Sequence, residues 1–304
     1  DADRNAPVQV LTDTGVLTDI IRIAAGDEFA LALDKDGFVW SWGANELGQL
    51  GDTTQNDRAY AAKVVCGEQT GGSADLHDII AIAAGGRVAM ALDRYGYVYA
   101  WGENTVGQLG ANSENTEELA PVQVWAGATA TGLNEKDSGV NGYLRNVFAI
   151  AAGGNQAGAI LDNGTAVTWG EDEYNQLGSE WQLNTYKWAM PVASGDQADK
   201  SLEDISQDRY LHRVTGMSIG DRSIVYQTTK HNPVGVAPTD HEHRALRNGE
   251  LSDRRGDEAD GTLNRTIWEP RPVFLVTGSD NHIVENVYKV SAGGRSGAAV
   301  AGIS

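Results

Sequence analysis

The chain has 304 residues, of which 41% are hydrophobic, with 37 glycines, 7 prolines and one cysteine. Its 42 acidic residues outnumber 23 basic ones and give a formal net charge of −19, which repels phosphate backbones and disfavours nucleic acid as a partner. No stretch approaches the roughly 18 apolar residues of a membrane helix, so we expect no membrane insertion. A single cysteine, Cys66, excludes an intrachain disulfide.

Three short signals recur at fixed spacing. Ala-Ala-Gly ends at Gly26, Gly85 and Gly153. Trp-Gly follows, with its tryptophan 16 residues after that glycine, at Trp42, Trp101 and Trp169. Leu-Gly closes the unit at Gly51, Gly110 and Gly178, 25 residues after the first glycine. Fixed spacing inside the unit and variable spacing between units indicate a repeated supersecondary structure joined by loops.

Each unit has the pattern of short strands. In the first, Ile21 and Ile23 alternate with other residues before the glycine, as in a half-buried strand. Phe29–Leu33 and Phe38–Trp42 then flank a turn with the Asp-Gly chemistry of a hairpin. A further short strand is expected between units, at Pro7–Val10, Lys63–Val65, Pro121–Val124 and Pro191–Val192. A leading proline suits the start or the edge of a sheet.

These hairpins predict an all-β fold, a β-propeller of four-stranded antiparallel blades with long inter-blade insertions. Alanines at 30/32, 89/91 and 157/159 lie on one face of the second strand, where small residues would let neighbouring sheets approach. We expect one propeller region over 1–304, with units at 7–51, 62–110, 120–178, 191–268 (divergent, with an insertion) and 272–304 (partial). This number of units predicts an incomplete propeller or part of a larger one, with strand edges to be paired.

The pattern Ala-Ala-Gly, Gly-x-Val-x-x-Trp-Gly and Asn-x-x-Gly-Gln-Leu-Gly resembles the regulator of chromosome condensation repeat. The first two units match almost completely, and the third has Asn175 where glycine is expected. Because Asn tolerates a left-handed backbone, we expect a preserved turn there. The fourth unit keeps Val214–Gly220 but has Val236 where the tryptophan should fall, and the resemblance is absent from 231–268.

Repetition favours a packing role for Trp42, Trp101 and Trp169, because a catalytic site needs its groups only once. Function is then expected where the units differ. The joint after the third unit reads SEWQLNTYKWAM and concentrates aromatic residues. They can anchor a protein partner, or fold back and bury themselves locally. The candidate partner-binding residues are Trp181, Tyr186, Trp188 and, in the preceding turn, Tyr174.

Catalytic and metal signals are weak. His231, His241 and His243 include a His-x-His pair, but no third ligand stands at a diagnostic spacing. The chain has no Gly-x-Ser-x-Gly, phosphate-binding glycine loop or His-Glu-x-x-His. We therefore expect no cofactor, no bound metal and no enzyme activity. A site in the propeller mouth or in the 231–268 insertion remains the enzymatic alternative.

The resemblance implies several functions on one scaffold. The family includes a guanine nucleotide exchange factor that contacts chromatin through basic elements, whereas this acidic chain lacks a basic tail. Its bacterial members include secreted and surface proteins, and a β-lactamase inhibitor that presents aromatic residues from its loops. The sequence therefore favours a non-enzymatic binding or surface-display propeller, extracellular or on the cell surface, acting through a protein partner or self-association. An exchange-factor-like regulator is the second alternative.

Overall fold

The computed structural model describes residues 6–126, 142–173, 175–178, 183–193, 210–211, 213–221 and 223–229, and the backbone of the strands within 243–301. Four antiparallel sheets of four strands follow one another along the chain, each with its strands in sequence order. We call these sheets blades 1 to 4. Blade 1 comprises β1 (Ile20–Ala25), β2 (Phe29–Asp34), β3 (Val39–Gly43) and β4 (Arg58–Lys63). Blade 2 comprises β5 (Ile79–Gly85), β6 (Val88–Asp93), β7 (Val98–Glu103) and β8 (Glu117–Gln123).

The remaining sheets repeat this order. Blade 3 comprises β9 (Val147–Gly153), β10 (Gln156–Leu161), β11 (Ala166–Glu171) and β12 (Thr185–Pro191). Blade 4 comprises β13 (Val214–Ile219), β14 (Ser223–Thr229), β15 (His243–Glu250) and β16 (Thr266–Pro272). Two hairpins follow, β17 (Phe274–Thr277) with β18 (Asp280–Ile283) and β19 (Val287–Gly293) with β20 (Ser296–Ala301). The expected all-β architecture of four-stranded antiparallel blades is confirmed.

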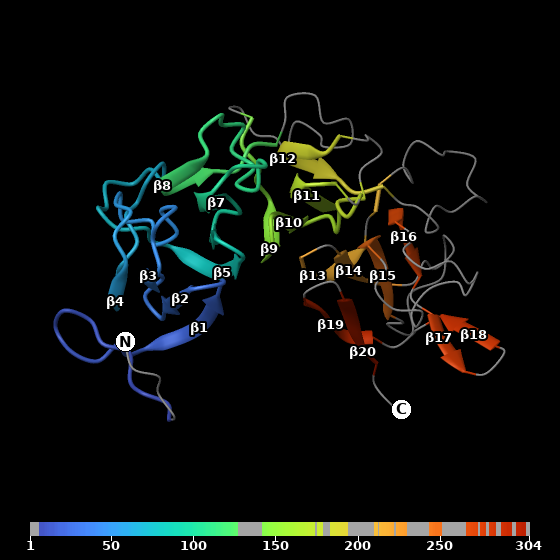
Figure 1. Ribbon diagram of the computed structural model, residues 1–304, viewed down its shortest axis with the longest axis horizontal. Coiled ribbons are helices and arrows are strands. Elements are labelled where there is room, and N and C mark those ends of the chain that lie inside the picture. The colour runs from blue at the N-terminus through green and yellow to red at the C-terminus, as the bar shows by residue number, and fades with distance from the viewer. Residues whose placement is uncertain are drawn as a thin grey trace.

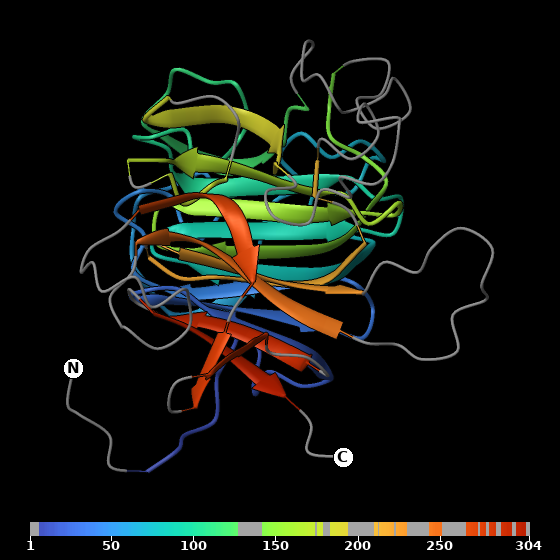
Figure 2. The ribbon, with the colours of Figure 1, turned by 90° about the vertical axis from the view of Figure 1, so that its right-hand side faces the viewer.

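The blades are arranged around an open arc (Figure 1). The first strand of each blade is innermost, and β1, β5, β9, β13 and β19 contact one another in that order along the arc. The fourth strand of each blade lies at the outside of the arc. After a rotation by 90° about the vertical axis, the strands are seen to run along the axis of this arc (Figure 2). In Figure 1 the described blades form a propeller arrangement that is not closed into a ring.

Tryptophan joins blade 2 to blade 1. Trp101 on β7 is fully buried, and its indole Nε1 donates a hydrogen bond of 2.9 Å to the carbonyl oxygen of Gln49 in blade 1. Ala89 and Ala91 on β6 pack in the same interface, opposite Leu31 and other large residues of blade 1. The expected role of these alanines, to let sheets approach closely, is confirmed.

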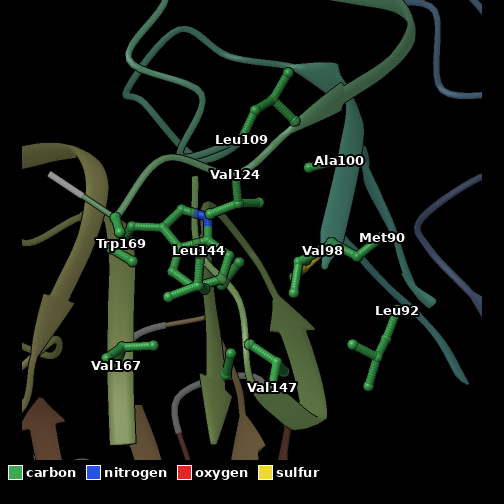
Figure 3. Close-up of a cluster of buried hydrophobic side chains, with 14 of the residues drawn as sticks. Met90, Leu92, Val98, Ala100, Leu109, Val124, Leu144, Val147, Val167 and Trp169 are labelled. Atoms are coloured by element: carbon green, nitrogen blue, oxygen red, sulfur yellow. The ribbon is translucent and has the colours of Figure 1, made fainter. Parts of the chain in front are cut away.

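Blades 2 and 3 meet in the same way. Trp169 is fully buried, and its Nε1 donates to the carbonyl of Gln108 at 3.1 Å. Figure 3 shows Trp169 among Val124 and Leu144, facing the Met90 and Val98 side of blade 2. The Gly-Gln-Leu-Gly turn of one blade thus receives the tryptophan of the next blade, which accounts for the repeated sequence as packing.

Trp42 differs from its two counterparts, which corrects the expectation that all three are buried alike. It is only half-buried, and Ile23 on the neighbouring inner strand is 79% exposed. The equivalent residues of blade 2 are Trp101 and Ile82, and both pack against blade 1. No described blade precedes blade 1, so Trp42 has no turn carbonyl to receive its indole.

The fourth strands lie earlier in the chain than the short strands expected around proline. β4, β8 and β12 begin five, four and six residues before the predicted Lys63, Pro121 and Pro191. Pro121 and Pro191 lie inside or at the end of their strands, on the outer edge of the sheet where a missing N–H is tolerated. Residues 7–10 form no strand, although Leu11 pairs with Val16 in an isolated bridge. Each sequence unit is therefore out of phase with its sheet by one strand.

Close packing at Gly85 and a left-handed backbone at Asn175 explain why the repeat keeps its glycines and turn residues. A Cβ built on Gly85 would lie 2.5 Å from the Cα of Gly153 on the neighbouring inner strand, which no side chain permits. Asn175 has a φ of +51°, in the same left-handed region as Gly48 and Gly107 at φ +77° and +76°. The expected preservation of this turn is confirmed.

The register of blade 4 corrects the position assigned to its missing tryptophan. In blades 1 to 3, the glycine after the tryptophan pairs with the first residue of the second strand of the same blade, and these glycines are Gly43, Gly102 and Gly170. In blade 4, Gly249 pairs with the first residue of β14, Ser223. Asn248 on β15 therefore occupies the tryptophan position, rather than Val236. The insertion lies before β15 and hid this alignment from spacing arguments.

Candidate functional site

The aromatic insertion is partly core. Tyr186 lies on β12, is 1% exposed, and its hydroxyl oxygen accepts a hydrogen bond of 3.3 Å from the backbone N–H of Leu183. Of the two alternatives that the sequence leaves open for this segment, local burial holds for Tyr186, because strand β12 directs it into the core between blades 3 and 4. Trp188 is half-buried against the same core, with its Nε1 3.0 Å from the Sδ of Met190. Trp181 and Tyr174 lie outside the described residues, and the partner-binding role of the set stays a prediction.

The candidate metal residues cannot be assembled into a site from the structure. His231 and His241 lie outside the described residues, and His243 begins β15. Among the described residues, no three His, Cys, Asp or Glu side chains are grouped to hold a metal ion. Within the same part of the chain, no helix has the length and apolarity needed to cross a membrane.

An acidic cavity of about 410 Å³, which we call the acidic mouth, opens along one face of the arc. It is lined by the turns between the first and second strands of four consecutive blades and by the last residues of β7 and β11. Its charged residues are one arginine and four carboxylates, namely Arg87, Asp27, Glu103, Glu171 and Asp221. This excess of negative charge disfavours phosphate groups at the mouth. The observation agrees with the argument from net charge against nucleic acid.

A second cavity, of about 300 Å³, lies beside the β6–β7 hairpin of blade 2, between the segments that precede and follow this blade, and we call it the tyrosine pocket. Its aromatic and polar wall consists of Asp93, Tyr95, Tyr97, Tyr99, Gln123 and Tyr143. Tyr99 is 3% exposed, and its hydroxyl lies 3.4 Å from Oδ2 of Asp93 and 3.4 Å from Nε2 of Gln123. Tyr143 packs edge-on against Trp125 at 5.3 Å between ring centroids, which fixes the ring.

Asp93 forms the base of the tyrosine pocket. It is 2% exposed, and its Oδ1 accepts hydrogen bonds of 2.9 Å from the backbone N–H groups of Tyr95 and Tyr97. Burial raises the pKa of the Asp93 carboxyl, although these hydrogen bonds oppose the effect. Burial, and then the nearby Asp93, also raise the pKa of the Tyr99 hydroxyl. The Tyr99 phenol therefore keeps its proton at neutral pH, beside the buried carboxyl group of Asp93.

This pocket is not predictable from the repeat pattern, because Tyr95, Tyr97 and Tyr99 lie inside the repeated unit, where repetition favours packing over function. A signal existed in the comparison of equivalent positions. Blade 1 has Phe38 and Trp40 where blade 2 has Tyr97 and Tyr99, so three tyrosines gather only at the second hairpin. Tyr143 belongs to the joint between units and reaches the pocket only through the fold.

A further buried carboxyl group stands at a repeat position. Asp172 is 3% exposed, and its Oδ1 accepts a hydrogen bond of 2.9 Å from the N–H of Leu177. Asn45 and Asn104 accept the equivalent bond from Leu50 and Leu109 in blades 1 and 2. Burial raises the pKa of Asp172 to about 7. The residue replaces a structural asparagine and faces the turn that closes its own unit.

Comparison with known families matches the first half of the chain. A model of the Regulator of chromosome condensation (RCC1) repeat matches residues 20–49 and 79–108. A second model of the same repeat matches residues 36–92 and 95–160. Among curated proteins, pim1 of Schizosaccharomyces pombe is 33% identical over 162 residues, which are 53% of this chain and 27% of pim1. The mitochondrial RCC1 domain-containing protein RUG3 of Arabidopsis thaliana is 30% identical over 208 residues, 66% of this chain and 38% of RUG3.

The chain thus spans well under half the length of these curated relatives. Among solved structures, human WBSCR16 superposes with a TM-score of 0.64 at 17% identity, over 95% of this chain and 60% of that one. Yeast RCC1, solved bound to Kap60, superposes with a TM-score of 0.50 at 19% identity, over 93% and 68% of the two chains. At these identities the likeness to solved structures shows the propeller fold.

Proposed function

Because the chain belongs to the RCC1 repeat family, we propose that it is a non-enzymatic propeller that acts through protein–protein contacts. The observation that carries this proposal is the use of the repeated residues. Trp101, Trp169 and the Gly-Gln-Leu-Gly turns are buried between blades. Contacts with a partner therefore fall to residues that differ between blades, and these line the exposed turns, joints and cavities.

The relatives support interaction as the kind of role. Yeast RCC1 was solved as a complex with another protein, Kap60. Human HERC5 and HERC2 are named as protein ligases, but the match covers 13% of the first and 3% of the second. Because the match covers so little of these two proteins, their names carry no ligase chemistry to this chain.

We further propose a secreted or surface-exposed protein of bacterial type whose partner is a protein or a second copy of the chain. Its net charge of −19 and the acidic mouth favour a partner with a basic surface. The insertion around Trp181 and Trp188 supplies aromatic groups of the type that dominate interface energies.

The test uses the intact chain and two serine variants. Replacing Trp181 and Trp188 with serine should weaken partner capture or self-association at least tenfold, while Tyr60→Ser, an exposed aromatic change on β4, should leave it unchanged. Light scattering measures self-association, and crosslinking followed by mass spectrometry identifies a bound protein. Stimulated release of guanine nucleotide from a small GTPase, or turnover of a glycan panel, would contradict the proposal in favour of an exchange factor or an enzyme.

A further inference from the structure

The same place in blades 1 and 2 is built in two different ways. In blade 1, Phe38 and Trp40 flank the ammonium group of Lys63, whose Nζ lies 3.5 Å from the centroid of the first ring and 5.7 Å from that of the second. The same Nζ lies 3.6 Å from Oδ2 of Asp75. Blade 1 therefore fills an aromatic and acidic cage with its own lysine.

Strand register identifies the equivalent residues of blade 2. Trp40 pairs with Lys63 across β3 and β4, and Tyr99 pairs with Gln123 across β7 and β8. The isolated bridge that places Asp75 opposite Val65 has its counterpart in Tyr143 opposite Trp125. The lysine and the aspartate of blade 1 thus correspond to the neutral residues Gln123 and Tyr143 in blade 2.

The turns beneath the two cages are built alike. Oδ1 of Asp34 accepts the N–H of Phe38 at 2.9 Å, and Oδ1 of Asp93 accepts the N–H of Tyr97 at the same distance. Oδ2 of Asp34 accepts the indole N–H of Trp40 at 2.8 Å, where Oδ2 of Asp93 lies 3.4 Å from the Tyr99 hydroxyl. Aromatic walls and a carboxyl base are therefore present in both blades, whereas the internal cation Lys63 and its ion-pair partner Asp75 are replaced in blade 2 by Gln123 and Tyr143.

We propose that the tyrosine pocket binds the alkylammonium group of a ligand in the position that Lys63 occupies in blade 1. Tyr97, Tyr99 and Tyr143 present ring surfaces to the cation, and the Asp93 carboxylate lies at its base. The group belongs to a lysine side chain of a polypeptide or to a free alkylamine, which share this chemistry. This site rests on the geometry of the pocket and not on the protein-interaction role proposed above, although a polypeptide lysine bound there would be one such contact.

The other charged residues of the pocket set the limits of this site. Asp78 adds a second carboxylate, which forms an ion pair of 2.8 Å with Arg94. Arg145 also lines the cavity and is engaged in an interaction of its own, and His77 uses Nδ1 towards the carbonyl of Asp75 at 3.1 Å. Because Arg145 also lines the cavity, a negatively charged carboxylate is the competing ligand. The experiment must therefore distinguish a cationic ligand from an anionic one.

The test titrates the intact chain with n-butylammonium, with its neutral isostere 1-butanol and with butyrate, followed by NMR. We expect butylammonium to bind at least tenfold more tightly than either of the others. Equal binding of butanol would show an unselective apolar cavity, and tighter binding of butyrate would show that Arg145 governs the site. Either result overturns the proposal. A parallel titration with N-acetyl-lysine methylamide distinguishes the two sources of the ammonium group. Binding of this compound would show that the pocket accepts a polypeptide lysine, and its failure to bind would restrict the site to free amines.

Three substitutions at one position provide matched controls. Gln123→Lys rebuilds the internal cation of blade 1 and should abolish butylammonium binding, whereas Gln123→Met should retain it and Gln123→Glu should strengthen it severalfold. The reciprocal Lys63→Gln should open a second, weaker site in blade 1. Unchanged binding in a folded Gln123→Lys variant, verified by an unaltered melting temperature, would show that the amine binds elsewhere.

Discussion

Replacing Asp172 by asparagine should stabilise the protein increasingly as pH rises. Asp172 is 3% exposed and burial raises its pKa from the ordinary 3.8 to about 7. The folded state therefore holds its proton more tightly than the unfolded state between these two pH values. By linkage, the folded state loses stability as pH rises through this interval, and the loss is complete above pH 7. Below pH 3.8 the carboxyl is protonated in both states and costs nothing.

The magnitude follows from the two pKa values. A difference of this size corresponds to about 4 kcal/mol at pH 8, and to about 1–2 kcal/mol at pH 5. Asparagine cannot ionise, and Asn45 and Asn104 show that it fits the same turn, with acceptor distances of 2.9 and 3.2 Å to the leucine N–H. Asp172→Asn should therefore be more stable than the natural chain at pH 8, with the advantage shrinking by about 3 kcal/mol at pH 5.

Urea denaturation of both chains at pH 5 and pH 8 measures this difference. Glu173→Gln, a charge removal at the exposed neighbouring position, is the control and should shift stability by less than about 0.5 kcal/mol at either pH. An advantage of Asp172→Asn that is the same at pH 5 and pH 8 would refute the reasoning, because it would show that Asp172 ionises normally in the folded protein.

Trp101→Ala and Trp169→Ala should each destabilise the fold by about 3–5 kcal/mol, and half-buried Trp42→Ala by less than half as much, as measured by denaturant midpoints; equal losses would contradict the packing of each tryptophan into the preceding blade. Gly85→Ala should cost several kcal/mol, because its Cβ meets backbone of the next blade, whereas Gly216→Ala on β13 meets the movable end of Gln227 and should cost about 1 kcal/mol or less; similar midpoints for the two variants would remove the argument from close approach. Lys63→Ala should destabilise the protein by about 1–2 kcal/mol, because the ammonium group loses its contacts with the rings of blade 1. Gln123→Ala should cost less, because Gln123 has no charge to place over an aromatic ring. Thermal melts compare the two variants, and a larger loss for Gln123→Ala would contradict the comparison of the cages.

The repeat made much of the fold predictable. Three signals at fixed spacing placed the hairpins, because the Asp-Gly turn and the strand alternation depend on local backbone chemistry. The alanine face of β6 was predictable for the same reason, since it recurs with the strand. The half-exposure of Trp42 was not predictable, because burial of that ring depends on a neighbouring blade and not on its own unit.

The candidate sites were harder to predict, because they depend on which segments the fold brings together. Tyr186 sits in a joint that looked like a loop, but pairing with β11 turns it into the core. The tyrosine pocket combines the hairpin around Tyr97 with Tyr143, which comes from the next joint. Spacing alone cannot show that these residues meet. The strand register shows that blade 2 has Gln123 at the position where blade 1 has Lys63.

Hydrogen exchange of the tryptophan indoles tests most directly whether the repeated residues form the packing contacts between blades. The Nε1–H groups of Trp101 and Trp169 donate to the carbonyls of Gln49 and Gln108 inside blade interfaces, while Trp42 has no such acceptor among the described residues. NMR of the folded chain in D₂O should therefore show exchange of the Trp101 and Trp169 indole protons at least a hundredfold slower than that of Trp42. Exchange of all three at the same rapid rate would contradict the account.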